Sequence, residues 1–269
     1  MSDYSLQDLI YLMERLRDPE HGCPWDLKQD FSSIVPHTLE EAYEVADTIE
    51  RKDWLHLEDE LGDLLFQVIF YSQLGKEQSL FEFNSIVNQL VTKLLRRHPH
   101  VFPDGQLRAA PSKVKLSETQ INANWEQIKQ QERLGKAKAA ILDDIPKGLP
   151  ALSRADKLQK RASQVGFDWN DPLLVLDKIE EEIAELREAI AQGNQDAIQD
   201  EMGDVIFAQV NLARHLGVKA EIALRSTNQK FERRFNHVEA CVESSGKDWG
   251  EYALDELDHF WDEAKQKGL

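Results

Sequence analysis

Apolar residues recur every three or four positions along most of this 269-residue chain, a spacing that places them on one face of an α-helix. Gly193, Gly217 and Gly246 each follow such a run, where the C-terminal cap of a helix is expected. No run alternates apolar and polar residues convincingly enough to indicate a strand. The pattern therefore predicts an all-α protein. The clearest helical runs span residues 6–16, 57–68, 173–190 and 198–212.

The second half of the chain repeats the first half, block by block and in the same order. We therefore predict two tandem homologous helical-bundle domains, residues 1–142 and 143–269. Pro146, Gly148 and Pro150 lie at the expected junction and interrupt helical structure there. The matched blocks include residues 39–44 with 180–185, 59–66 with 200–207, 93–97 with 230–234, and 125–130 with 261–266.

Four acidic residues of the second half are spaced to form a metal site. Residues three apart lie on one face of a helix, so Glu182 and Glu185 project together, as do Glu201 and Asp204. If the two helices pack antiparallel through the short turn at 191–196, the four carboxylates converge. Like charges in one cleft favour proton uptake unless cations fill it, and oxygen-only ligands suit Mg²⁺ or Mn²⁺. The first half offers the same set at Glu41, Glu44, Glu60 and Asp63.

A Glu-x-x-Glu spacing alone is common on solvated helix faces, and Glu41 also fits a helix capping box with Thr38. Two features favour a metal site. Gly62 and Gly203 each precede the aspartate inside an apolar helix, where glycine costs about 1 kcal/mol relative to alanine. We expect a close approach to the backbone at these glycines. The second feature is the duplication, because a solvated face has no reason to reproduce one carboxylate spacing.

Charge and composition restrict the partners. The formal net charge of −17 repels a phosphodiester backbone, so we expect no nucleic-acid partner. The two cysteines, Cys23 and Cys241, form no C-x-x-C pair, which argues against a structural zinc site and a disulfide framework. The N-terminus lacks a basic segment followed by an apolar one, and no stretch approaches about 18 apolar residues. We expect a soluble protein of a reducing cytoplasm, without a membrane partner.

Cationic residues near the predicted site suit a small phosphorylated ligand. Lys178 lies one turn before Glu182 on the same helix face, and Lys230, Arg233 and Arg234 lie on a later helix. A triphosphate carries about four negative charges, which such cations and two divalent ions can offset. Trp261 suits stacking on a base, but a core tryptophan is an equally good interpretation.

The pattern E-E-x-x-E followed by E-x-x-D on the next helix resembles the signature of the all-α nucleoside triphosphate pyrophosphohydrolases. Nearly the whole chain resembles the two-domain members of the MazG family, including the segments 15–26, 96–102 and 230–235. The resemblance implies Mg²⁺-dependent cleavage, with Mn²⁺ as a substitute, of a nucleoside or deoxynucleoside triphosphate to the monophosphate and pyrophosphate. It also implies broad base tolerance and an interleaved helical homodimer.

The resemblance also implies roles for individual residues. Glu181 or Glu182 is expected to orient or deprotonate the attacking water. The metal ligands it implies are Glu182, Glu185, Glu201 and Asp204. The nucleotide contacts it implies are Lys178, Glu181, Asn211, Lys230, Arg233, Arg234, Trp261 and, from the first domain, Lys129.

The two copies differ around their carboxylates. His37 occupies the position of Lys178, and histidine carries only part of a positive charge near neutral pH. Phe70 occupies the position of Asn211, two turns beyond the aspartate. We therefore predict that the second domain catalyses the reaction. The first domain is expected to be weak or inactive on triphosphates and to act in folding, dimerisation or regulation.

Two alternatives belong to other classes. A ferritin-like di-iron bundle requires E-x-x-H motifs, and no glutamate of either carboxylate set has histidine three positions later. A non-catalytic helical interaction protein with vestigial carboxylates predicts no nucleotide turnover. Canonical triphosphates, damaged or deaminated triphosphates and an alarmone all fit this pattern as the physiological substrate.

The assignment of catalysis to the second domain predicts unequal effects of one substitution made in both copies. Glu201→Gln should lower turnover of a triphosphate by at least about 100-fold. Loss of a residue that only hydrogen-bonds to a metal ligand lowers activity by up to about 100-fold, and Glu201 is predicted to bind the metal directly. Glu60→Gln should leave turnover close to wild type. Steady-state rates of both variants, with helicity checked by circular dichroism, test this. Loss of turnover in Glu60→Gln alone would reverse the assignment.

Overall fold

The computed structural model describes residues 4–108, 116–134 and 140–269. Within these residues all regular structure is helical, which confirms the predicted all-α class. The chain divides into two compact units, Met1–Gly135 and Lys136–Leu269, here called the N-terminal and C-terminal units. The domain boundary predicted at 142 and 143 lies within the C-terminal unit. No helix among the described residues is long and apolar enough to cross a membrane.

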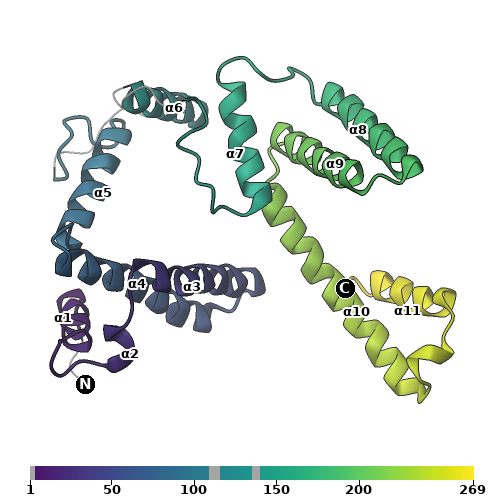
Figure 1. Ribbon diagram of the computed structural model, residues 1–269, viewed down its shortest axis with the longest axis horizontal. Coiled ribbons are helices and arrows are strands. Elements are labelled where there is room, and N and C mark those ends of the chain that lie inside the picture. The colour runs from purple at the N-terminus through teal and green to yellow at the C-terminus, as the bar shows by residue number, and fades with distance from the viewer. Residues whose placement is uncertain (1–3, 109–115, 135–139) are drawn as a thin grey trace. The chain divides into compact units, whose positions relative to one another are not determined.

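The N-terminal unit is built around the paired helices α3 and α4, with α1 packed against α4 (Figure 1). Its core consists of the fully buried Met13, Ile34, Ile69, Phe70 and Leu74. These residues join α1, α3 and α4 through apolar contact, which is the dominant source of stability in such a bundle. The helices are α1 (Leu6–Leu16), α2 (Pro24–Leu27), α3 (Phe31–Arg51), α4 (Trp54–Glu77), α5 (Phe83–Arg97) and α6 (Glu118–Leu134).

The C-terminal unit repeats the helical pair as α8 and α9, which pack on each other more extensively than any other two helices (Figure 1). Helix α7 covers α9, and Gln159 donates a hydrogen bond to the carbonyl of Phe207 at 2.7 Å. Helix α10 is followed by a short 3₁₀ turn and by α11, which packs back on it. The elements are α7 (Ala151–Ser163), α8 (Pro172–Gln192), α9 (Gln195–His215), α10 (Ala220–Ser245), η1 (Trp249–Glu251) and α11 (Leu254–Gln266).

The turn between α8 and α9 is as short as the sequence indicated. Gly193 caps α8 in the left-handed region, with φ of 67°, where a side chain would be strained. Asn194 then caps α9, because its side-chain oxygen accepts from the backbone N–H groups of Asp196 and Ala197 at 3.2 and 3.3 Å. Two consecutive caps reverse the chain without a loop, so the faces of α8 and α9 meet in a fixed register.

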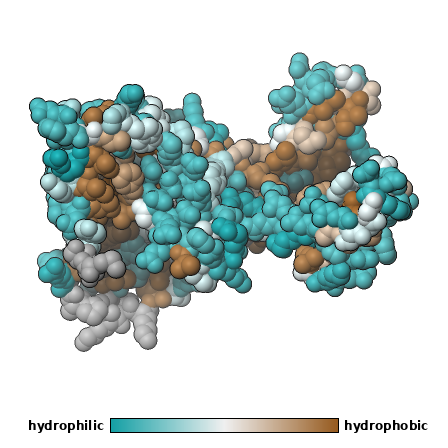
Figure 2. Space-filling model, turned by 90° about the horizontal axis from the view of Figure 1, so that it is seen from below, coloured by the Kyte–Doolittle hydropathy of each residue, from teal (hydrophilic) through white to brown (hydrophobic). Residues whose placement is uncertain are grey.

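Large apolar side chains remain exposed on the paired helices. On α8, Leu173 is 65% exposed and Ile190 is 57% exposed, and Met202 and Phe207 on α9 are also exposed. Hydrophobic side chains gather in broad areas on the surface of the molecule (Figure 2). Apolar areas of this kind mark contact surfaces more often than solvated ones.

Candidate metal and nucleotide site

The α8–α9 pair brings three of the four predicted metal ligands together. Glu182 on α8 and Glu201 and Asp204 on α9 have carboxylate oxygens that all lie within 4.8 Å of one another. We call these three residues the C-terminal carboxylate cluster. The N-terminal unit contains the matching set on α3 and α4, the N-terminal carboxylate cluster, within the same limit. Its members are Glu41, Glu60 and Asp63.

The fourth carboxylate of each copy lies beside its cluster. Glu185 has a raised pKa, first because it loses hydration, then because it shares a hydrogen bond with Glu182 and is repelled by Glu182 and Glu201. In the N-terminal unit the pKa of Glu60 is raised by lost hydration and then by Glu44. The pKa of Glu41 is also raised, by lost hydration and then by repulsion from Asp63. A cation must displace protons from such groups, so its affinity falls as the pH is lowered.

The C-terminal carboxylate cluster fits a hard divalent cation. Glu182 is buried, at 7% exposure. The Oε2 atom of Glu201 is buried and has no hydrogen-bond partner among the described residues. A buried carboxylate oxygen without a partner is costly, and the neighbouring carboxylates add repulsion. A cation held by these oxygens removes both penalties, and Mg²⁺ and Mn²⁺ prefer oxygen ligands.

Lys178 forms the positive edge of this cluster. Its ammonium lies 2.8 Å from the Oε1 atom of Glu181 and 2.9 Å from the Oε1 atom of Glu182. These two contacts, in that order of importance, raise the pKa of Lys178, so it stays charged at neutral pH. The corresponding His37 lies 3.6 Å from the carboxylate of Glu40, a distance too long for a hydrogen bond.

Asn211 lies on α9, two turns beyond Asp204, and is buried at 5% exposure. Its side-chain oxygen accepts two hydrogen bonds from Arg214, at 3.1 and 2.7 Å. Arg214 also pairs with Asp168 at 2.6 Å. Arg214 was not among the residues predicted from the sequence. Its spacing of three from Asn211 on one helix could have indicated that the two side chains meet. In the N-terminal unit the corresponding Phe70 is a fully buried core residue.

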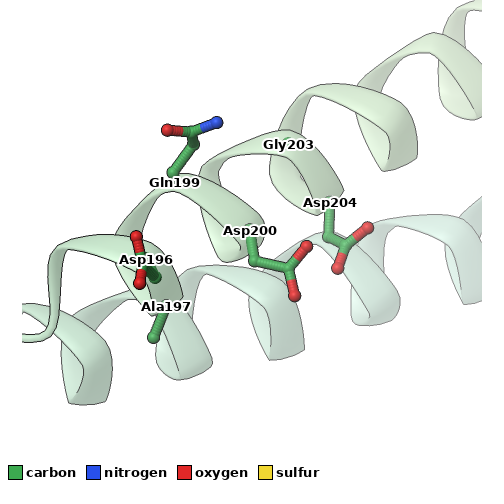
Figure 3. A pocket seen from close by; sticks show the side chains of 6 residues that line it. All are labelled: Asp196, Ala197, Gln199, Asp200, Gly203 and Asp204. Atoms are coloured by element: carbon green, nitrogen blue, oxygen red, sulfur yellow. The ribbon is translucent and has the colours of Figure 1, made fainter.

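An open cavity of about 510 Å³ lies over the start of α9. Asp200 and Asp204 extend over this cavity from the same side of the helix, whereas Gln199 points away from them (Figure 3). Asp200 was not among the predicted ligands. Its spacing of four from Asp204 was the signal that placed both carboxylates on one face. The lining consists of Asp196, Ala197, Gln199, Asp200, Gly203 and Asp204.

Gly203 is open to this cavity. A Cβ atom built at Gly203 would meet no atom within 4 Å, and the same holds at Gly62. The described residues therefore do not provide the close contact that we expected at these glycines. The space that glycine keeps free beside Asp204 is available to a ligand.

The predicted nucleotide-binding residues of α10 and α11 form a separate group. Arg234 donates a hydrogen bond to the carbonyl of Leu269 at 2.8 Å, and its guanidinium lies 5.7 Å from the centre of the half-buried Trp261 ring. Trp261 also packs on Phe231, with ring centroids 5.1 Å apart. Among the described side chains, no interaction joins this group to the carboxylates of α8 and α9. The group also includes the exposed Lys230 and Arg233, whereas the side chain of Lys129 lies outside the described residues.

The fold and the carboxylates define a class: a helical protein with a cluster of carboxylates on a helical pair, present once in each half of the described chain. The MazG nucleotide pyrophosphohydrolase domain matches this chain twice, at residues 29–102 and 170–239. The chain therefore belongs to the MazG family, as the carboxylate signature predicted. The two matches also confirm the tandem arrangement of homologous helical domains.

Several curated proteins are similar over nearly the whole chain. The nucleoside triphosphate pyrophosphohydrolase of Escherichia coli K12 is 49% identical over 265 residues, which cover 97% of each chain. The nucleoside triphosphate pyrophosphohydrolase/pyrophosphatase MazG of Thermotoga maritima is 41% identical over 259 residues, covering 96% of this chain and 95% of the relative. The uncharacterized protein YabN of Bacillus subtilis is 38% identical over 256 residues, which make up 50% of its length.

The open space beside Gly203 predicts opposite effects of one substitution on stability and activity. Gly203→Ala should raise the free energy of unfolding by about 1 kcal/mol, because alanine favours the helix and its methyl group meets nothing. The same methyl group should lower kcat/KM by about tenfold, which corresponds to about 1.4 kcal/mol of transition-state binding, if a ligand uses the space.

Gly62→Ala is the matched control for this prediction. It should stabilise the N-terminal unit to a similar extent and leave kcat/KM unchanged. Denaturant unfolding and steady-state kinetics measure both effects. Full activity in Gly203→Ala would show that no ligand occupies the space beside Asp204.

Proposed function

We propose that this protein hydrolyses nucleoside and deoxynucleoside triphosphates to the monophosphate and pyrophosphate, and that its C-terminal unit carries the activity. One observation carries the proposal: Glu182, Glu201 and Asp204 converge on α8 and α9, with a buried oxygen of Glu201 unpaired among the described residues. The proposal is supported by the relatives from Escherichia coli and Thermotoga maritima, which are named nucleoside triphosphate pyrophosphohydrolases.

Mg²⁺, with Mn²⁺ as a substitute, is the proposed cofactor, held by the C-terminal carboxylate cluster and Glu185. When bound, it would neutralise phosphate charge and make a water molecule more nucleophilic at neutral pH. The buried Glu182 is suited to fix the position of the ion, because its surroundings limit its movement. Glu181 is more exposed and is held by Lys178, so it can orient the attacking water and accept its proton.

Lys178 supplies the positive charge that the phosphates require. Its ammonium lies at the edge of the cluster, paired with both Glu181 and Glu182, and it is 31% exposed. An incoming phosphate can therefore take over one of its hydrogen bonds without the lysine leaving the site. Phosphoryl transfer depends chiefly on such positioning and charge stabilisation, because the developing charge is spread over the phosphate oxygens.

The proposal places weaker or no activity in the N-terminal unit, although its carboxylates are arranged alike. His37 offers less positive charge than Lys178 and is not hydrogen-bonded to Glu40. Phe70 fills the core where the C-terminal unit has Asn211 held by Arg214. These differences leave the N-terminal unit able to hold a cation but poorly equipped to hold a triphosphate.

Broad base tolerance follows from the residues proposed to bind the nucleotide. Lys178, Lys230 and Arg233 carry charges that suit phosphate groups. Trp261 offers a ring face, and stacking on an aromatic ring accepts every base. The described residues proposed to bind the nucleotide therefore contact its phosphates or stack on its base, and neither contact selects among the hydrogen-bonding edges of different bases.

We also propose that the protein acts as a homodimer whose active sites combine residues of both chains. Among the described residues of one chain, the cations of α10 make no contact with the carboxylates of α8 and α9, which supports a second chain as their source. The exposed apolar side chains of α8 and α9, including Leu173 and Ile190, give such a dimer a surface to bury.

Product analysis tests the proposed chemistry. A panel of nucleoside and deoxynucleoside triphosphates, incubated with the protein and Mg²⁺, should yield monophosphate and pyrophosphate in equal amounts. Removal of the cation with a chelator should abolish turnover, and the Glu201→Gln variant should show only background. Release of orthophosphate and diphosphate would contradict the reaction. Absence of turnover across the panel would favour a non-catalytic interaction protein.

Mixing two inactive variants tests the shared active site. Glu201→Gln lacks a carboxylate ligand, and a double variant, Lys230→Ala with Arg233→Ala, lacks the cations of α10. Random reassociation should restore about a quarter of wild-type turnover, because half of the dimers are mixed and each mixed dimer keeps one intact shared site. Sites built within single chains would regain nothing. Light scattering shows whether a dimer forms.

A further inference from the structure

The hairpin formed by α10 and α11 carries a second group of potential metal ligands. Its donor atoms include sulfur and nitrogen, whereas the carboxylate clusters offer only oxygen. His237 and Cys241 lie four residues apart on α10, and His259 and Glu263 lie four residues apart on α11. A spacing of four places each pair on one face of its helix. Because α11 packs on α10, Glu263 lies close to the α10 pair, whereas His259 is largely exposed.

Three of these side chains converge on one point. The Sγ atom of Cys241 lies 3.6 Å from the Nε2 atom of His237, and the Oε2 atom of Glu263 lies 3.6 Å from that same nitrogen. The potential ligand atoms of all three residues lie within 4.8 Å of one another. The Nε2 atom of His259 lies 3.5 Å from the other oxygen of Glu263.

A nucleophilic triad does not explain this arrangement. In a triad the nucleophile contacts one ring nitrogen of histidine and the carboxylate contacts the other. Here the thiol and the carboxylate both lie at Nε2 of His237. A hydrogen bond between His237 and Glu263 does not explain it either, because 3.6 Å is too long.

The distances fit ligands that share a zinc ion. Zinc binds sulfur at about 2.3 Å, nitrogen at about 2.05 Å and oxygen at about 2.1 Å in tetrahedral geometry, which separates sulfur from nitrogen by about 3.6 Å and nitrogen from oxygen by about 3.4 Å. The observed separations are 3.6 Å for both pairs. We propose that His237, Cys241 and Glu263 bind Zn²⁺ as three protein ligands, which leaves the fourth tetrahedral position to a water molecule.

The donor set separates this site from the carboxylate clusters. A thiolate and an imidazole nitrogen select a softer ion such as Zn²⁺, whereas the oxygen-only clusters suit Mg²⁺ or Mn²⁺. The sequence argument against zinc rested on the missing C-x-x-C pair, but a helical hairpin can assemble a single cysteine with residues of another helix. The ion would clamp α11 to α10 near Trp261.

Lys267 competes with the ion for this position. Its ammonium lies 3.3 Å from Nε2 of His237 and 3.9 Å from Oε2 of Glu263, so a positive charge already sits among the ligands. The side chain is 57% exposed, which allows it to swing into solvent when zinc binds. Loss of this competing charge in Lys267→Met should tighten zinc binding.

Cobalt serves as the spectroscopic probe, because Co²⁺ occupies zinc sites and gives a thiolate-to-metal charge-transfer absorption. The full-length protein, saturated with Mg²⁺ to fill the carboxylate clusters, should bind about one Co²⁺ per chain with this absorption. Cys241→Ser should abolish the absorption, and Cys23→Ser is the matched control that should retain it. Glu201→Gln should also retain it, because the site does not depend on catalysis.

Zinc itself should displace the cobalt and raise the melting temperature of the wild-type protein by mass action. His237→Ala, with helicity checked by circular dichroism, should lose this increase, and Lys267→Met should reach it at a lower zinc concentration. The proposal is overturned if the charge-transfer absorption is absent, or if it survives Cys241→Ser and disappears in Cys23→Ser.

Discussion

Repulsion between carboxylates that two helices hold at close range is the constraint on which the rest of each unit depends. Glu182, Glu201 and Asp204 lie within 4.8 Å of one another, and such crowding opposes the packing of α8 on α9. The consecutive caps at Gly193 and Asn194 fix the reversal between these helices, and α7 also packs on α9. Lys178 offsets part of the negative charge at the edge.

The two units share one arrangement of paired helices but differ in the side chains around their carboxylates. Both hold the same three carboxylates, yet the N-terminal unit uses the Phe70 position to complete its apolar core with Met13 and Ile69. The C-terminal unit places a buried amide there, bound by Arg214. Burying a polar group requires a partner, so Asn211 and Arg214 have to be retained or lost together.

Local patterns in the sequence predicted the helices and the convergence of the carboxylates, because both depend on spacings of three or four residues. The packing contacts between elements that no short turn joins were not predicted. The ion pair between Arg214 and Asp168 joins a helix to a distant loop, and the proximity of Cys241 to Glu263 depends on how α11 packs on α10. The two glycines were assigned a close contact that no described residue makes, because sequence alone cannot distinguish space for a ligand from space for a neighbour.

Lys178 also has a consequence for turnover. Because its ammonium already pairs with Glu182, a cation entering the cluster meets a less negative potential than three bare carboxylates would present. Such a cluster would hold the proposed Mg²⁺ less tightly than three bare carboxylates would. For an enzyme that releases a highly charged product together with its counter-ion, as proposed for the C-terminal unit, moderate affinity would favour rapid exit.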